Sequence, residues 1–251
     1  MPSRRNFITA TAGFCIYALL QESRASVPRR RLLPASRWIQ QQDELARGLA
    51  GGKVSQLEWH DAVSRTDWRW KWISNRCRMS SAAPSLARGG NPFGHDPQKR
   101  FVSFLDGQGQ VLQLRYAVAL FQFDADSVIT PHAHRHMAST HLVVEGKLRV
   151  RTFDRVRDEN QSLVLRPVID EIASVGHATA MTSARDNVHW FAPRSERAMT
   201  LDVIVDGLDK GPQRYEIQPV DPIGGIELPD GTLRAPLLSF ERSAQVYKAS
   251  L

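Results

Sequence analysis

Three of the eight histidines of this chain lie within five residues, at His132, His134 and His136 in the segment Pro-His-Ala-His-Arg-His. In a β-strand, side chains alternate between the two faces, so the H-x-H pair His132 and His134 points two imidazoles to the same side. Two imidazole nitrogens converging in this way can bind one divalent metal ion. A third ligand has to come from another strand, and His189, in the apolar segment 188–191, is the candidate. We therefore predict a metal site made of His132, His134 and His189.

The residues after this pair resemble the first sequence motif of the cupin superfamily. That motif has H-x-H, three or four residues, a glutamate, six residues and a glycine. Here four residues separate His134 from Ser139, and six more precede Gly146, so the spacing is kept while the glutamate is absent. The resemblance implies a cupin-type β-barrel, or jelly roll, that binds one divalent metal.

A barrel with three histidines and no acidic ligand resembles the three-histidine thiol dioxygenases: cysteine dioxygenase, cysteamine dioxygenase and the plant cysteine oxidases. Segment 129–156 aligns with their first motif without a gap. Asn-Val-His at 187–189, followed by Thr-Leu-Asp-Val-Ile at 200–204, resembles the "N-x-H … L-D-V-L" stretch of the cysteamine and plant branch. The resemblance covers residues 99–205. It implies an iron(II) enzyme that oxidises a small thiol with O₂ to a sulfinic acid, with Asp202 orienting a ligand or the substrate.

The ligand set has a chemical consequence. Three neutral imidazoles leave a divalent metal with its full charge and with open positions for a thiolate and O₂, whereas a carboxylate would take one position and part of the charge. Iron(II) is the preferred metal, with manganese, nickel, copper and zinc as alternatives. No arginine occupies the place where cysteine dioxygenase grips its substrate carboxylate, since segment 102–106 is mostly apolar. The small-molecule substrate is therefore open.

His141 is a further candidate for the site. It has the same strand parity as Ser139, so it is expected to face the barrel interior, either as a fourth ligand or as a hydrogen-bonding neighbour of the ligands. We name Asp202 and His141 as the catalytic candidates. His136 is expected in a turn after the strand, and Trp190 is expected to pack outside the barrel, because it points away from its neighbour His189.

Short β-prone runs fill the second half of the chain, and no helical pattern lies between them. The expected strands are 101–105, 112–123, 141–144, 148–153, 163–168, 172–182, 188–191 and 199–205, with turns at Asp106-Gly107, Glu145-Gly146 and Asp206-Gly207. This pattern predicts a mainly β protein, a single cupin-type barrel over 99–220 followed by a C-terminal extension, 221–251.

The segment before the barrel, 26–98, is expected to hold a linker and a helical cap. One helix is predicted over 36–49, capped by Ser36, and a second from Ser55, because Ser55 and Glu58 have the capping-box spacing. Trp68, Trp70 and Trp72 alternate with cations, as in a strand that fills a core or a subunit contact. A homodimer through this run is one expectation.

Residues 1–25 resemble a twin-arginine export signal. Arg4-Arg5 precede the apolar run 7–20, and small residues at Ser23 and Ala25 fit a cleavage site. This predicts the twin-arginine export machinery as a partner, a periplasmic or secreted location, and no stable membrane anchor, because fourteen apolar residues are fewer than the roughly 18 that a span needs. The net charge is +7, but no nucleic-acid-binding motif accompanies it, so we expect no nucleic-acid partner.

Three functions are compatible with this sequence. The first is a periplasmic iron-dependent thiol dioxygenase-like enzyme. The second is a non-catalytic metal-binding or sensing cupin, and the third is a cupin oxygenase that acts on a phenol or a diketone.

Overall fold

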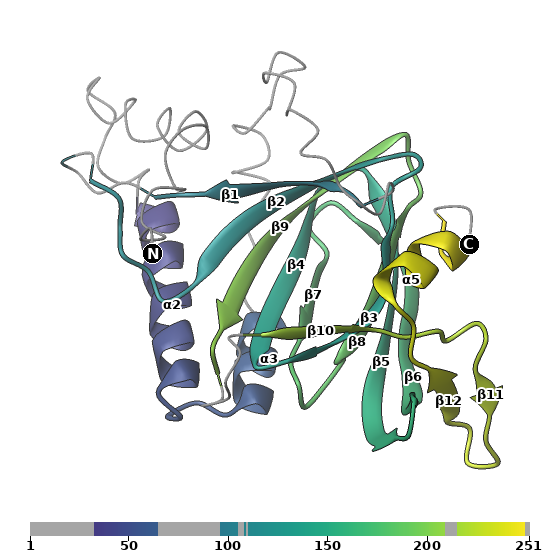
Figure 1. Cartoon of the computed structure of the whole chain (residues 1–251). Helices are drawn as coiled ribbons and strands as arrows, with labels where there is room; N and C mark the ends of the chain where they lie inside the picture. The colour runs from purple at the N-terminus through teal and green to yellow at the C-terminus, as the bar shows by residue number, and fades with distance from the viewer. Residues whose placement is uncertain (1–32, 65–95, 105–107, 109, 209–214, 249–251) are drawn as a thin grey trace, which may run out of the picture.

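The computed structural model describes residues 33–64, 96–104, 108, 110–208 and 215–248. The expected export signal (1–25), the start of the linker, the tryptophan run 68–72 and the turn at 106–107 lie outside the described residues. Two sheets and three helices make up the described part (Figure 1).

The strands form two antiparallel sheets that face each other. They are β1 (Gln98–Val102), β2 (Ala117–Asp124), β3 (Ile129–Arg135), β4 (Met137–Glu145), β5 (Lys147–Glu159), β6 (Ser162–Ser174), β7 (Ala178–Met181), β8 (Val188–Pro193), β9 (Arg197–Asp206), β10 (Glu216–Pro219), β11 (Ile226–Glu227) and β12 (Leu233–Pro236). One sheet has the order β1-β2-β9-β4-β7, and the other has β10-β3-β8-β5-β6-β12-β11.

The eight strands β2 to β9 pair in a nested way. β5 pairs with β6 and β4 with β7, and outside these β3 pairs with β8 and β2 with β9. This order is a long hairpin rolled up on itself, which is the jelly roll. The predicted mainly β fold class is therefore confirmed.

Some strand bounds differ from those predicted from the sequence. The run 172–182 is not one strand, because β6 continues to Ser174 and β7 starts only at Ala178. Between them Gly176 has φ +93°, and the amide of His177 donates to the Ser174 carbonyl (2.9 Å), so the chain turns here. β2 starts at Ala117 rather than at 112.

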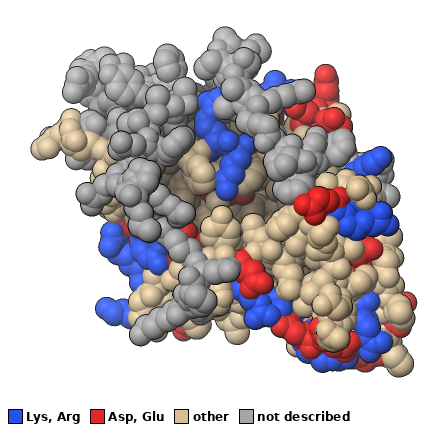
Figure 2. All heavy atoms as spheres, in the orientation of Figure 1, with Lys and Arg blue, Asp and Glu red and all other residues tan. Residues whose placement is uncertain are grey.

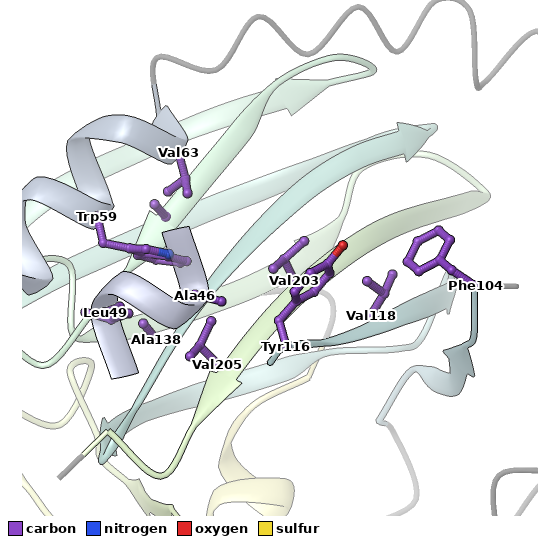
Figure 3. Packing of buried hydrophobic residues seen from close by; sticks show 11 residues of the cluster. Ala46, Leu49, Trp59, Val63, Phe104, Tyr116, Val118, Ala138, Val203 and Val205 are labelled. Carbon is purple, nitrogen blue, oxygen red and sulfur yellow. The ribbon is translucent and has the colours of Figure 1, made fainter. Parts of the chain in front are cut away.

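The helical cap packs on the outer face of the sheet β1-β2-β9-β4-β7. It consists of α2 (Leu33–Ala50) and α3 (Gln56–Ser64). Trp59, fully buried, lies against the sheet together with Leu49 and Val63, as Figure 3 shows. These side chains share a core cluster with the strand residues Val118, Ala138, Val203 and Val205 and with Tyr116, which directly precedes β2. Burial of a side chain as large as tryptophan stabilises such a contact by about 3–5 kcal/mol relative to alanine.

The helix starts are confirmed in one case and wrong in the other. The Ser55 amide donates to Glu58 Oε2 (2.8 Å) and the Glu58 amide donates to Ser55 Oγ (3.2 Å), which is the predicted capping box. Ser36 instead lies inside α2, which begins at Leu33.

A buried polar contact also ties the cap to the barrel. Nε2 of His60 in α3 lies 3.0 Å from Oδ2 of Asp186, and Thr152 Oγ1 donates to the other oxygen of the same carboxylate (2.5 Å). All three residues are buried. Buried polar groups need such partners, so this contact fixes where α3 sits on the barrel.

The described part of the C-terminal segment, residues 221–248, completes the second sheet and covers its outside. β12 pairs with β6, and Tyr247, the residue after α5 (Phe240–Val246), packs edge-to-face on Trp190 with ring centroids 4.9 Å apart. Arg151 lies 3.7 Å above the same indole ring. Trp190 is thus buried outside the barrel, under α5. Among the described residues, no helix has the length and apolar character needed to span a bilayer.

Charges are mixed on the face shown in Figure 2, where Lys and Arg side chains alternate with Asp and Glu. The described residues form several exposed ion pairs, among them Arg149 with Asp170 (2.7 Å) and Arg234 with Glu159 (2.6 Å). Exposed pairs of this kind contribute about 0–1 kcal/mol each. The fold therefore depends on its apolar clusters rather than on its surface charges.

Substitution of Gly146, in the predicted turn between β4 and β5, tests how closely this turn packs against the start of β9. Its φ is +69°, and an added Cβ would lie against the Arg197 carbonyl oxygen and 2.9 Å from Cα of Ala198. We expect Gly146→Ala to lower the free energy of unfolding by about 2–4 kcal/mol, because backbone strain and a backbone clash add. Urea-induced unfolding measures this change.

Gly231→Ala is the matched control for this prediction. Gly231 has φ +75°, but no heavy atom lies within 4 Å of an added Cβ. The control should lose only the strain of a left-handed residue, about 1–2 kcal/mol. Equal losses at the two positions would contradict the proposed clash.

Candidate metal centre

Two strands of the second sheet bring the three predicted ligands together. β3 carries His132 and His134 on its inner face, and β8 carries His189, which is the direct register partner of His132. The ring centroids lie 4.6 Å apart for His132 and His134, 4.4 Å for His132 and His189, and 5.0 Å for His134 and His189. One nitrogen from each ring lies within 4.8 Å of the other two, so the three can hold one metal ion.

Burial keeps these imidazoles neutral. His134 and His189 are buried, and His132 is partly buried. Loss of solvation lowers the pKa of His132 to about 4 and holds the pKa values of His134 and His189 well below the ordinary 6.5. At neutral pH each ring therefore offers a lone pair rather than a positive charge, which is the state that metal binding requires.

Hydrogen bonds on the far side of two rings fix which nitrogen faces the cluster. His132 Nδ1–H donates to the Thr130 carbonyl (2.7 Å), because a carbonyl can only accept. His134 Nδ1–H donates to the Met137 thioether sulfur (2.8 Å). The Nε2 atoms are then left as metal donors, and His134 Nε2 is buried with no hydrogen-bond partner in the protein.

His189 Nδ1 is likewise buried without a partner. A buried ring nitrogen with no partner is costly, and a metal ion bound at the cluster would satisfy His134 Nε2. A divalent metal ion bound by three neutral imidazoles therefore fits the residues present.

Asn187 holds the two ligand strands in register. Its side-chain amide donates to the His134 carbonyl (2.8 Å) and to the Thr182 carbonyl (3.1 Å), and Asn187 is almost fully buried. These bonds fasten the end of β3 to the segment that leads into β8. Asn187 entered the sequence analysis only as part of a motif, and its partners were not visible there.

We expect Asn187→Ala to weaken Zn²⁺ binding by about 10- to 100-fold, as is typical when a residue that orients a ligand is lost. The physical reason is that the His134 carbonyl loses its donor, which frees β3 to shift relative to β8. Competition with a chromophoric chelator measures the affinity. Asn160→Ala, an exposed change in the turn between β5 and β6, is the control and should leave the affinity unchanged.

The other sheet places a second polar group beside the three rings. His141 in β4 and Asp202 in β9 are register partners, and His141 Nδ1–H donates to Asp202 Oδ2 (2.7 Å). The Ser139 hydroxyl lies 3.0 Å from His141 Nε2, which accepts its proton in this tautomer. Ser139, His141 and Asp202 are all buried, and the His141 ring centroid lies 4.9 Å from that of His189.

Both ring nitrogens of His141 thus have partners within the protein. In this arrangement His141 has no free lone pair for a metal, and it acts on the cluster as a neighbour. Asp202 Oδ1 is buried with no partner and remains available as an acceptor. Ser139, which stands where the cupin motif has glutamate, bonds to His141.

β1 adds a cation on the same face as Asp202. Lys99 is in register with Phe121, and Phe101 is in register with Ala119, the partner of Asp202. The Lys99 ammonium lies 4.7 Å from the Phe101 ring centroid. Partial loss of solvation lowers the pKa of Lys99, although its side chain is exposed, and the charge of Asp202 opposes the shift. The site therefore has a basic residue at its β1 edge.

Known proteins resemble this chain in fold alone. No family model matches the sequence, and no curated protein matches it. Similar solved structures include procruciferin, an 11S globulin from Brassica napus, at 13% identity over 42% of this chain and 23% of its own (TM-score 0.33). A sugar phosphate isomerase from a cupin superfamily of Silicibacter pomeroyi is 19% identical over 43% of this chain and 59% of its own (TM-score 0.30).

A Klebsiella pneumoniae protein with a double-stranded β-helix domain is 13% identical over 49% of this chain and 85% of its own (TM-score 0.32). The chain thus spans about a quarter of the globulin and 59% of the isomerase. At these values the fold assignment rests on the strand order. The chain is a mainly β jelly roll whose β3 and β8 bring three histidines to one point.

Proposed function

We propose that this protein is a metal-dependent oxygenase of the cupin type that binds iron(II) and oxidises a small thiol with O₂. The observation that carries the proposal is the cluster of three neutral imidazoles, His132, His134 and His189, which includes no carboxylate. Such a set leaves a bound divalent ion with its full charge, which favours a thiolate ligand. When bound, the metal would supply open coordination positions for a thiolate and O₂ next to each other.

The residues of the chain have distinct tasks in this proposal. His132, His134 and His189 would hold the metal. Asp202 and His141 act as positioning residues, because their hydrogen bond fixes the imidazole that accepts the Ser139 hydroxyl. Reactants held in one geometry on one ion react as if within a single molecule.

Apolar side chains close the barrel beside the cluster. Phe191 stacks on His189 with ring centroids 5.0 Å apart, and it belongs to an interior cluster with Phe123, Val143 and Leu148. These apolar side chains keep water away from one side of the site. A dry wall strengthens the electrostatic contacts of a bound thiolate.

Oxygen uptake tests the proposal. Purified protein is loaded with Fe(II) without air and then exposed to O₂ with cysteamine, cysteine or no thiol. We expect O₂ uptake only with a thiol, and we expect the product to be a sulfinic acid. Both atoms of ¹⁸O₂ should be recovered on sulfur, because a thiolate and one O₂ molecule together have the composition of a sulfinate.

Two other results would contradict the proposed function. Uptake with a phenol or a diketone but with no thiol would make the protein an oxygenase of another class. Tight metal binding with no uptake on any of these compounds would make it a metal-binding or sensing protein.

We further propose that residues 1–25 direct the folded protein out of the cytoplasm by the twin-arginine route. Folding before export lets the cytoplasm supply the metal, which matters because raw affinity favours copper and zinc over iron. Metal analysis of protein exported by its own signal tests whether the metal is bound before export. Copper or zinc in place of iron in the exported protein would contradict it.

A further inference from the structure

We propose that Met137 is an oxidation-sensitive residue that controls the affinity of the three-histidine site for metal. This inference rests on the proposed function only for the use of His134 as a metal ligand. Met137 is the first residue of β4 and follows His136, whose φ of +62° turns the chain from β3 into β4. This tight turn brings the Met137 sulfur to 2.8 Å from His134 Nδ1.

The sulfur is the partner that sets the tautomer of His134. A thioether is a weak acceptor, whereas the corresponding nitrogen of His132 donates to a carbonyl oxygen, a strong one. His134 thus has weaker support than His132. A chemical change at Met137 therefore acts directly on the orientation of one metal ligand.

Hydroperoxides supply that chemical change. Hydrogen peroxide transfers one oxygen atom to the Met137 sulfur: the O–O bond breaks, an S–O bond forms, the sulfur loses two electrons and the peroxide is reduced to water. Met137 lies on the same face of β4 as Ser139 and His141, with 7% of its surface exposed. Met181 (1%) and Met199 (3%) are more deeply buried. We expect Met137 to react first among these three.

The product does not fit the contact that it replaces. Oxidation adds an oxygen atom to a buried sulfur that already lies 2.8 Å from His134 Nδ1. The sulfoxide oxygen is a stronger acceptor than the thioether sulfur, so the Nδ1–H group turns from the sulfur toward the oxygen. Because protein interiors are close-packed, room for this oxygen comes from a shift of the imidazole or of the start of β4, and His134 Nε2 then moves away from the other two ligands.

Zinc, which has no redox chemistry, separates this inference from the oxygenase activity. The full chain, metal-free, is treated with graded hydrogen peroxide, and each of its five methionines is followed by peptide mass spectrometry. Zn²⁺ affinity is then measured by competition with a chromophoric chelator. We expect the affinity to fall at least about 10-fold in step with oxidation of Met137, as for loss of other residues that orient a ligand.

Two comparisons decide the outcome. Methionine sulfoxide reductase should restore the affinity of the wild-type protein, which excludes damage to histidine or cysteine because the enzyme does not reverse it. Met137→Leu keeps a side chain of similar volume and should make Zn²⁺ binding insensitive to peroxide.

Three results would overturn the inference. They are oxidation of Met181 or Met199 before Met137, unchanged Zn²⁺ affinity after Met137 is oxidised, and equal peroxide sensitivity in Met137→Leu. Reductase rescue keeps the test valid even if that variant does not fold. Failure of thiol oxidation by the iron-loaded protein leaves all of these readings in place.

Discussion

Replacing His189 by alanine is expected to abolish stoichiometric binding of Zn²⁺ and Fe²⁺ at micromolar metal. Two imidazoles, His132 and His134, remain, and they come from one strand, so the metal loses the ligand that closes the site from β8. We expect the affinity to fall on the order of 10³-fold, or about 4 kcal/mol. Thiol-dependent O₂ uptake should disappear with it, because the reaction needs the bound metal.

Two measurements check this expectation. Isothermal titration or chelator competition gives the stoichiometry and affinity. Thermal unfolding gives the stabilisation by metal, which for the wild type should reach about 2.7 kcal/mol at a free metal concentration of 100 Kd and should vanish in the variant. Circular dichroism of the metal-free variant establishes that it is folded.

His177→Ala is the matched control. His177 follows the turn between β6 and β7, and its Nε2 contacts Glu171 (2.8 Å) at the surface, so its loss should not affect metal binding. Full stoichiometry and unchanged affinity in His189→Ala would show that the three rings do not act as one site.

The local part of this site could be predicted from the sequence, because it depends on strand parity alone. His132 and His134 share a face in any strand, and His141 shares a face with Ser139. The capping box of Ser55 and Glu58 is local in the same sense, since its hydrogen bonds span three residues. In patterns of this kind, the spacing along the chain alone sets the relative positions of the side chains.

Long-range pairing could not be predicted in the same way. The register of His132 with His189 depends on β4 to β7 folding between them into nested hairpins, which no local pattern encodes. Asn187 was missed as a partner of His134 for the same reason, since 53 residues separate the two. Met137 was missed because its contact depends on the turn at His136 rather than on strand parity.

Helix and strand ends were harder still to predict. Ser36 has the composition of an N-cap, yet α2 begins at Leu33, because a good capping residue is also tolerated inside a helix. The run 172–182 is β-prone throughout, and its division at Gly176 depends on the amide of Gly176 donating to the Val143 carbonyl in β4 (2.9 Å). A partner strand thus decided where the turn falls.

Metal-free protein is expected to lose stability steeply as the pH falls from 6.5 to about 4.5. The pKa of His132 is lowered to about 4, and those of His134 and His189 lie well below 6.5. In the unfolded chain the same histidines take up protons near pH 6.5. The unfolded state therefore binds more protons than the folded state in this range, and the free energy of unfolding falls as the pH falls.

The sign and size follow from these values. The contribution is fully present above pH 6.5 and is lost as the pH drops toward the folded-state pKa. For His132 alone, a difference of about 2.5 pKa units corresponds to about 3 kcal/mol. The other two ligands add to this, against a total stability of about 5–15 kcal/mol for an ordinary domain. We expect metal-free protein to unfold in mild acid.

Urea-induced unfolding of metal-free protein at a series of pH values measures the slope. The carboxylates in surface ion pairs, such as Asp158 and Asp170, have lowered pKa values and lose their contribution only below about pH 4, so the range from 6.5 to 4.5 reports the histidines. Three histidines give a limiting slope of about 4 kcal/mol per pH unit. His134→Leu removes one of them and should reduce the slope by about a third.

Bound Zn²⁺ should shift the acid transition to lower pH, because the metal holds the ring nitrogens deprotonated in the folded state alone. The metal and the proton compete for the same lone pairs, so the shift grows with the free metal concentration. A flat stability profile between pH 7 and 5 in metal-free protein, or the same slope in His134→Leu, would mean that these rings are not enclosed. The prediction that the three rings form a metal site shielded from water would then be wrong.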